Sequence, residues 1–172
     1  MSDRILVAYA SGTGSTVGVA EAIGAALAAH GVEVDVRPMD EVSDLSAYRA
    51  VVAGSAIRNQ AWLPEAMAWL QTHRAALAQK PFAAFLVCMT MAARNETYRQ
   101  GVREWLAPVR ALVPPVSEGF FAGVLDLAQV PTWRQRLGFR LSVLLGVWRE
   151  GDHRDWDAIR VWADELPAKL LA

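Results

Sequence analysis

The sequence predicts an α/β protein in which a mostly parallel sheet is covered by helices on both faces. Apolar, strand-like runs alternate with stretches of helical periodicity along the chain. The runs at 4–10, 50–53 and 82–88 are apolar almost throughout, as expected of strands buried on both faces. A length of 172 residues, with 53% apolar and 20% charged residues, fits a single domain over 1–172.

The first part of the chain is expected to supply three strands. The strand at 4–10 leads into a helix that Gly31 ends and whose apolar positions recur at helical spacing, at Ala20, Ile23, Gly24 and Leu27. Alternation over 32–36 predicts a second strand nearer an edge of the sheet. The buried run at 50–53 is the third strand.

The middle of the chain predicts two loops around a helix and a strand. Residues 55–62 follow the third strand as a loop, and 63–77 is expected to be a helix that tolerates Pro64 in its first turn. The fourth strand covers 82–88 and is followed by a second loop at 89–95.

The last part of the chain contains one segment that breaks the alternation. A helix carrying Tyr98, Val102, Trp105 and Leu106 precedes a fifth strand at 116–122. The final helix is expected to begin at Asp155, a good N-cap, and to bend or end at Pro167. Between them lies an insertion at 123–151, and a connection this long inside a compact domain usually has a function.

Composition excludes several classes of function. The formal net charge of −1 disfavours nucleic-acid binding through a basic surface. The single cysteine, Cys88, forms no intrachain disulfide, and no Cys/His cluster has zinc spacing, so we expect no metal. No apolar run reaches the ~18–20 residues that span a bilayer, and no signal peptide precedes the first strand. The expected location is cytoplasmic.

The stretch Ser11-Gly12-Thr13-Gly14-Ser15-Thr16 is the clearest candidate site. It joins a buried strand to a helix N-terminus, where free N–H groups and hydroxyls bind an anion. A Walker loop would need a Lys, and none is near. A dinucleotide fingerprint would need a third glycine where Val17 stands, and an acidic residue where Arg37 stands. A single terminal phosphate remains as the expected ligand.

The pattern Ser11-x-Thr13-Gly14-x-Thr16 resembles the FMN-phosphate loop of flavodoxins. That resemblance implies a flavodoxin-like three-layer sandwich, with a five-stranded parallel sheet in the order 2-1-3-4-5. It implies FMN as the cofactor, with its ring between the loops 55–62 and 89–95. The implied cofactor-binding residues are Ser11, Gly12, Thr13, Gly14, Ser15, Thr16, Ser55, Ala56, Ile57, Arg58, Thr90, Met91, Ala92 and Asn95.

Two further stretches resemble one flavodoxin subfamily, the menaquinone-dependent protoporphyrinogen IX dehydrogenases. They are Gly54-Ser55-Ala56-Ile57-Arg58 and the stretch 151–159, which begins Gly-Asp-His-Arg-Asp-Trp; the insertion at 123–151 adds to the likeness. The resemblance implies an FMN-dependent oxidoreductase of heme biosynthesis, which oxidises a porphyrinogen and reduces a quinone. Arg58 is the candidate catalytic residue, as a charge partner of reduced flavin or of a substrate carboxylate.

Within the insertion, residues 131–149 have the pattern of an interfacial helix. Apolar residues recur every three or four positions, at Trp133, Leu137, Leu141, Leu144, Leu145 and Trp148. Arginines accompany them and acidic residues are absent. We expect substrate, quinone or membrane docking at the inner face of the cell membrane, through Trp133, Arg134, Arg136, Arg140 and Trp148. The alternatives are packing on the core or on a second subunit in a homodimer.

Two other functions remain open. A flavodoxin-type electron carrier that docks on redox protein partners would need an acidic face, and this chain is nearly neutral. A flavin-free regulatory domain would retain only the fold. The segment Asp152-His153-Arg154-Asp155 offers acid–base groups, but a helix start with a cap explains it equally simply.

Overall fold

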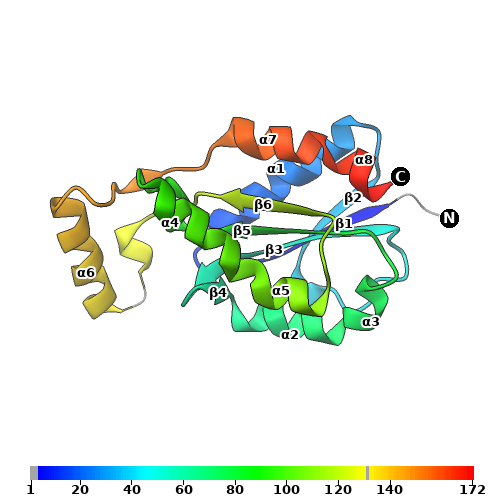
Figure 1. Ribbon diagram of the computed structural model, residues 1–172, viewed down its shortest axis with the longest axis horizontal. Helices are drawn as coiled ribbons and strands as arrows, with labels where there is room; N and C mark the ends of the chain where they lie inside the picture. The colour runs from blue at the N-terminus through cyan, green and yellow to red at the C-terminus, as the bar shows by residue number, and fades with distance from the viewer. Residues whose placement is uncertain (1–3, 131) are drawn as a thin grey trace.

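A computed structural model describes residues 4–130 and 132–172, and it contains a parallel sheet between two layers of helices (Figure 1). The strands lie in the order β2 (Val34–Pro38), β1 (Ile5–Ala10), β3 (Ala50–Arg58), β5 (Phe82–Val87) and β6 (Ser117–Phe121). Every neighbouring pair in this row is parallel. The predicted fold and the predicted order 2-1-3-4-5 are therefore confirmed.

Helices cover both faces of the sheet and enclose one hydrophobic cluster on each side. One face carries α1 (Ser15–Ala29), α7 (Trp156–Asp164) and α8 (Leu166–Leu170). The other carries α2 (Pro64–Thr72), α3 (Arg74–Leu77), α4 (Glu96–Gly101) and α5 (Ala107–Leu112), with the short 3₁₀ segments η1 (Met39–Glu41), η2 (Met89–Ala92) and η3 (Val102–Leu106). Alternate residues of β1 enter the two clusters, because successive side chains of a strand point to opposite faces.

Several predicted helix boundaries are confirmed by their local chemistry. Gly31 follows α1 in the left-handed conformation, with φ 79°. Pro64 lies in the first turn of α2, where its missing N–H costs nothing. Asp155 caps α7, because its Oδ1 accepts a hydrogen bond from the Ala158 N–H at 2.9 Å. Pro167 lies in the first turn of α8, directly after α7 ends.

The predicted loop at 55–62 is wrong, because these residues form a β-hairpin. Strand β3 continues to Arg58, turns at two residues, and returns as β4 (Ala61–Trp62), which pairs with β3 in the antiparallel sense. The turn residues Asn59 and Gln60 have φ 51° and 62°, as a two-residue hairpin turn requires. Glycine is absent from this turn, so the sequence lacked the usual hairpin signal.

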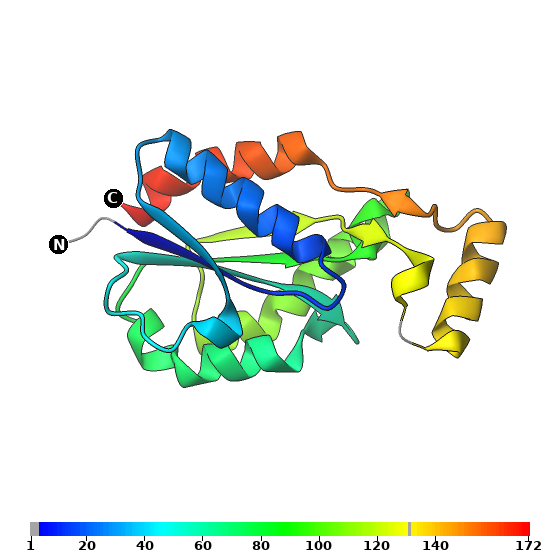
Figure 2. The same cartoon turned by 180° about the vertical axis from the view of Figure 1, so that it is seen from behind.

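The insertion at 123–151 forms an arm beyond the carboxyl ends of the strands (Figure 2). Strands β7 (Val124–Leu125) and β8 (Gly151–Asp152) pair in the antiparallel sense and make its root. The arm proper, residues 126–150, contains η4 (Leu127–Gln129) and α6 (Trp133–Leu144), and residue 131 of the predicted docking segment lies outside the described residues. Within the described part of the chain, no helix is long and apolar enough to cross a membrane.

Candidate functional site

The predicted phosphate loop lies between β1 and α1, at the carboxyl end of β1, which pairs with β2 on one side and β3 on the other. Gly14 has φ 90°, which places a glycine where an L side chain would be strained. Its N–H donates to the Oγ of Ser11 at 2.9 Å. Ser11 therefore shapes the loop, while Gly12 and Thr13 are exposed at its tip.

Thr16 carries the most informative polar atom of this loop. Its side chain is fully buried in the first turn of α1, and its Oγ1 has no hydrogen-bond partner among the described residues. A buried hydroxyl without a partner is costly, and most such groups in proteins are paired. The hydroxyl lies where the free N–H groups of a helix N-terminus attract an anion. A bound anion would satisfy it, and the residues of this loop fit a phosphate.

Arg58 lies against the phosphate loop, although it comes from the hairpin. A Cβ added at Gly12 would lie 3.6 Å from Nη2 of the Arg58 guanidinium. The fold therefore brings together two of the predicted site segments that are far apart in sequence. A guanidinium beside a phosphate loop offers charge-assisted hydrogen bonds to an anion.

The hydroxyl of Ser55 forms hydrogen bonds within the fold. Its side chain is fully buried, and its Oγ accepts a hydrogen bond from the Leu63 N–H at 3.0 Å. The hydroxyl in turn donates to the Ala56 carbonyl oxygen at 2.7 Å. Ser55 thus fixes the hairpin to the start of α2, while Ala56 and Ile57 remain partly exposed beside the site.

A cavity of about 520 Å³ adjoins the loop and has the arm as its outer wall. On the body side it is lined by Gly12, Thr13, Ala56, Ile57 and Arg58. This volume suits a ring-sized ligand. The arm contributes residues that sequence reasoning missed, among them Asp126, Gln129, Gln135 and Phe139. Gln135 and Phe139 lie on the face of α6 opposite to the leucines, but periodicity alone does not show that this face lines a cavity.

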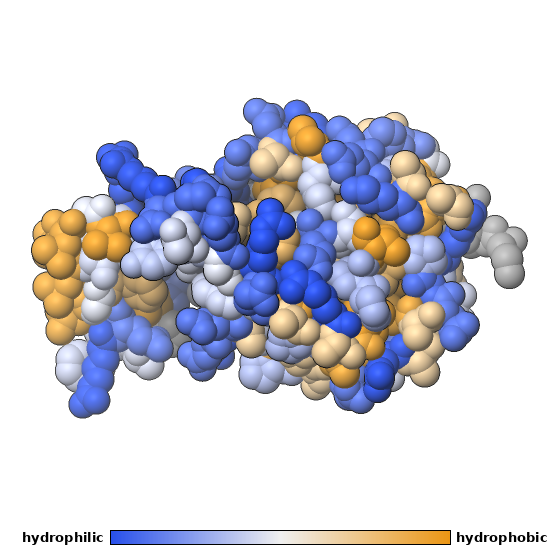
Figure 3. Space-filling model, viewed as in Figure 1, coloured by the Kyte–Doolittle hydropathy of each residue, from blue (hydrophilic) through white to orange (hydrophobic). Residues whose placement is uncertain are grey.

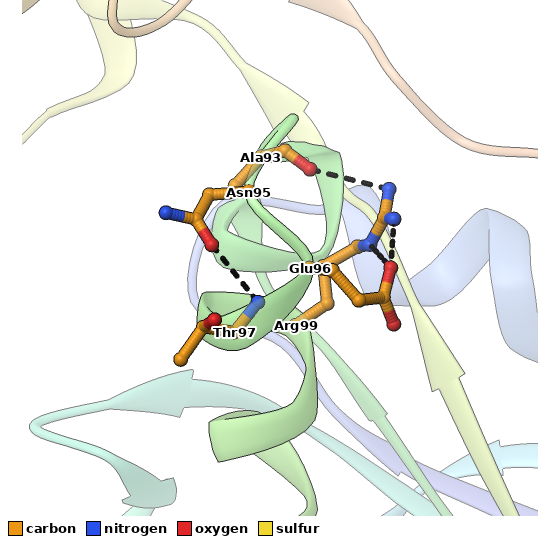
Figure 4. A network of polar contacts seen from close by, with 5 residues as sticks. All are labelled: Ala93, Asn95, Glu96, Thr97 and Arg99. Carbon is orange, nitrogen blue, oxygen red and sulfur yellow. Dashed lines mark hydrogen bonds and ion pairs between the residues drawn. The ribbon is translucent and has the colours of Figure 1, made fainter.

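The second predicted loop faces a different cavity. Met89, Thr90, Met91 and Ala92 form η2, and Asn95 caps α4 through its Oδ1, which accepts from the Thr97 N–H at 2.9 Å (Figure 4). Ala92 and Asn95 line a cavity of about 670 Å³, together with Trp148, Arg149 and His153. Thr90 and Met91 are partly buried and line neither this cavity nor the one beside the phosphate loop.

Arg99 holds the backbone of this second loop. It donates to the Ala93 carbonyl oxygen at 3.3 Å and pairs with Glu96 in the first turn of α4 (Figure 4). These contacts and the Asn95 cap fix the loop within its own element. The second loop is therefore held in place by contacts within its own segment.

The predicted docking residues separate onto different sides of the arm. Trp133 is 69% exposed, with Arg134 stacked over its ring at 5.5 Å, and Arg140 is exposed. Arg136 instead donates to the Val130 carbonyl oxygen at 3.0 Å and belongs to the arm's internal structure. Trp148 is half-buried and lines the cavity that also contains Ala92 and Asn95.

Helix α6 leaves an apolar face uncovered. Leu144 is 82% exposed, and none of the residues of α6 is buried. Figure 3 shows these hydrophobic side chains gathered at the end of the arm that is remote from the body. At 100° per residue, Trp133, Leu137, Leu141 and Leu144 share this face, and Gln135 and Phe139 point to the cavity side.

Comparison with known proteins identifies a family model that matches residues 6–141, the flavodoxin domain. No curated protein matches the chain. Among solved structures, a flavodoxin of Streptococcus pneumoniae TIGR4 is similar over 97% of this chain and 99% of its own, with a TM-score of 0.60 and 16% identity.

Two other solved structures share the fold. A flavodoxin from the domain Archaea is similar over 98% of this chain and 99% of its own, with a TM-score of 0.57 and 17% identity. The rubredoxin oxygen:oxidoreductase of Desulfovibrio gigas is similar over 99% of this chain but only 38% of its own, with a TM-score of 0.52 and 19% identity. At these identities the likeness shows the fold.

Proposed function

This chain belongs to the flavodoxin-domain family, and we propose that it is an FMN-binding redox protein whose cofactor phosphate binds at residues 11–16. The observation that carries this proposal is the fully buried, unpartnered Oγ1 of Thr16 in the first turn of α1. A phosphate oxygen is the acceptor that this hydroxyl and the adjacent helix N–H groups lack.

The chain's own residues have distinct parts in this proposal. FMN, when bound, supplies the ability to accept and release electrons. The loop 11–16 binds the phosphate, and Arg58 places positive charge beside it. Ala56 and Ile57 give the neighbouring cavity an apolar wall, while residues of the arm line its outer side.

The first candidate role is that of a flavodoxin-type electron carrier, which membership of the family favours. A second, more acidic cavity of about 390 Å³ adjoins the other side of the phosphate loop and is lined by Ser11, Gly14, Asp40 and Glu65. Carboxylates next to a redox site suit a positively charged protein partner, because complementary charge directs encounter.

The second candidate role is oxidation of a porphyrinogen with a quinone as acceptor, which the arm favours. Its inner face walls the candidate ring cavity, and its outer face exposes apolar side chains with Arg134 and Arg140 beside them. Such a face suits an anionic membrane surface, where a lipid-soluble quinone is available. In this role Arg58 would hold a substrate carboxylate.

Flavin binding tests the common part of the proposal. Apoprotein titrated with FMN is expected to change the visible flavin spectrum and to quench flavin fluorescence at a one-to-one ratio. Absence of binding would overturn the proposal.

Anaerobic turnover separates the two candidate roles. The holoprotein is supplied with protoporphyrinogen IX and menaquinone in one assay, and with a reduced redox protein and a protein acceptor in the other. Oxidation of the porphyrinogen that depends on quinone supports the dehydrogenase role. Electron transfer between proteins without porphyrinogen oxidation supports the carrier role.

A further inference from the structure

Arg154 links the root of the arm to the helix that follows the phosphate loop. Its Nε and Nη2 donate to the two carboxylate oxygens of Asp152 in β8, at 2.9 and 2.6 Å. Its Nη1 donates to the carbonyl oxygen of Ser15, the first residue of α1, at 3.4 Å. One guanidinium thus spans two elements that are far apart in sequence.

The surroundings of Arg154 hold its guanidinium in one place. The Cζ atom of Arg154 lies over the Trp156 ring, 4.5 Å from its centre. On the side of α1 it fills the space left by Gly18, where an added Cβ would lie 2.5 Å from Nη1. Only 18% of the side chain is exposed. A larger residue at position 18 would displace the guanidinium from α1.

The charge of Arg154 is balanced by its partner. The hydrogen bonds from Arg154 lower the pKa of the Asp152 carboxyl, which keeps the pair ionised at neutral pH. Arg154 therefore influences α1 chiefly by fixing its geometry. The first turn of α1 contains the free N–H groups and the Thr16 hydroxyl that the proposed function assigns to the phosphate.

We propose that Arg154 is a positioning residue for the cofactor phosphate, acting through the Ser15 carbonyl group and seated in the space that Gly18 leaves. The inference rests on the proposed function, since it concerns the same phosphate site. It assigns a role to the Gly-Asp-His-Arg-Asp-Trp stretch, in which Asp152 orients the guanidinium and Trp156 covers it.

Two flavins that differ only in the phosphate provide the test. Apoprotein of the wild type and of Arg154→Met is titrated with FMN and with riboflavin, which has the same ring and lacks the phosphate. The affinity for FMN is expected to fall about tenfold in the variant, because the first turn of α1 loses the hydrogen bond from the guanidinium that holds it, while the affinity for riboflavin stays unchanged. General damage to the fold would weaken both flavins alike.

Two further variants and a control sharpen the result. Gly18→Ala displaces the guanidinium without removing it and is expected to lower FMN affinity selectively. Arg154→Lys keeps the charge but not the paired contacts with Asp152, so it should restore less than half of the lost binding free energy. Arg160→Met is the matched control, because Arg160 is exposed on α7 and, among the described residues, forms an ion pair with Asp157 on its own helix.

Each outcome decides the proposal. An equal loss for both flavins, or no loss in either Arg154→Met or Gly18→Ala, overturns the positioning role and leaves the proposed function standing. A wild-type protein that binds neither flavin overturns the proposed function and this inference with it. Thermal unfolding of each apoprotein shows whether the variants fold, and Asp152→Asn replaces any variant that does not.

Discussion

At the scale of single residues, two buried hydroxyl groups near the site differ in their hydrogen bonding. The sequence pattern predicted both Ser55 and Thr16 as contacts of the cofactor. Ser55 satisfies its hydrogen bonds within the hairpin and the start of α2. Thr16 is equally buried but has no partner. The pattern of residue types could not separate them, because the difference arises from the tertiary course of β3 and β4.

Replacing Thr16 with valine is expected to move stability and affinity in opposite directions. The apoprotein should gain about 1 kcal/mol of free energy of unfolding, because a buried hydroxyl without a partner is removed. FMN affinity should fall by about 10- to 100-fold, because a hydrogen bond to a charged phosphate is lost. Thermal unfolding of the apoprotein and flavin titration measure the two effects. A variant that loses stability and keeps its affinity would contradict the assignment of Thr16.

Cys88 makes stability depend on pH in the alkaline range. Burial raises the pKa of its thiol to about 11. The thiol of an unfolded chain ionises near ~8.5, so it loses its proton before the folded one does. This group therefore leaves stability unchanged below about pH 8.5 and lowers it as the pH rises towards 11. Urea unfolding between pH 8 and pH 11 should show this decline, and Cys88→Ala should show a smaller one.

At the scale of elements, the sequence predicted the sheet well because its strands are buried on both faces. Continuous apolar runs such as 50–53 and 82–88 leave little choice of structure, and the strand order followed from the resemblance of residues 11–16 to the FMN-phosphate loop of flavodoxins. The hairpin at 55–62 was not predicted, because its turn, Asn59-Gln60, lacks the glycine that usually marks such turns. The sequence of a turn therefore predicts a hairpin reliably only where the turn contains residues that favour positive φ, such as Asn-Gly.

The hairpin turn therefore predicts a stabilising substitution. Gln60 has φ 62°, a conformation that costs most L residues about 1 kcal/mol and costs glycine almost nothing. Gln60→Gly should raise the midpoint of thermal unfolding by a few degrees, about 2–4 °C for a chain of this size. The matched control is Gln79→Gly, at a position outside this turn, which is expected to give no such gain. A fall in the midpoint for Gln60→Gly would show that the turn is not strained.

At the scale of the whole molecule, a sheet-and-helix body carries the phosphate loop and an arm carries the exposed apolar surface. The sequence located the insertion at 123–151 and the apolar face of its helix. It missed the inner face, because Gln135 and Phe139 become cavity residues only when the β7–β8 root holds the arm over the hairpin. A cavity between distant segments cannot be read from the periodicity of either segment.

The outer face of the arm is predicted to bind anionic membranes. Wild-type protein is expected to float with vesicles that contain anionic lipid, because the leucines of α6 are exposed and Arg134 and Arg140 lie beside them. The double substitution Leu141→Gln and Leu144→Gln should lower binding at least about tenfold, because two apolar side chains no longer enter the interface. Added salt should weaken the binding that remains, since it screens the arginines.

This test needs a matched control, and it must also distinguish membrane binding from binding of a second copy of the chain. Val161→Gln removes an exposed apolar side chain from α7, on the body of the protein, and should leave vesicle binding unchanged. FMN affinity should be the same in all these variants, because none of the substituted residues lines the cavity beside the phosphate loop. The wild type could instead fail to bind vesicles and form a dimer that the double substitution Leu141→Gln and Leu144→Gln disrupts. In that case the apolar face of α6 binds a second copy of the chain. Sedimentation without lipid distinguishes these outcomes, because the same uncovered surface would then be buried between two arms.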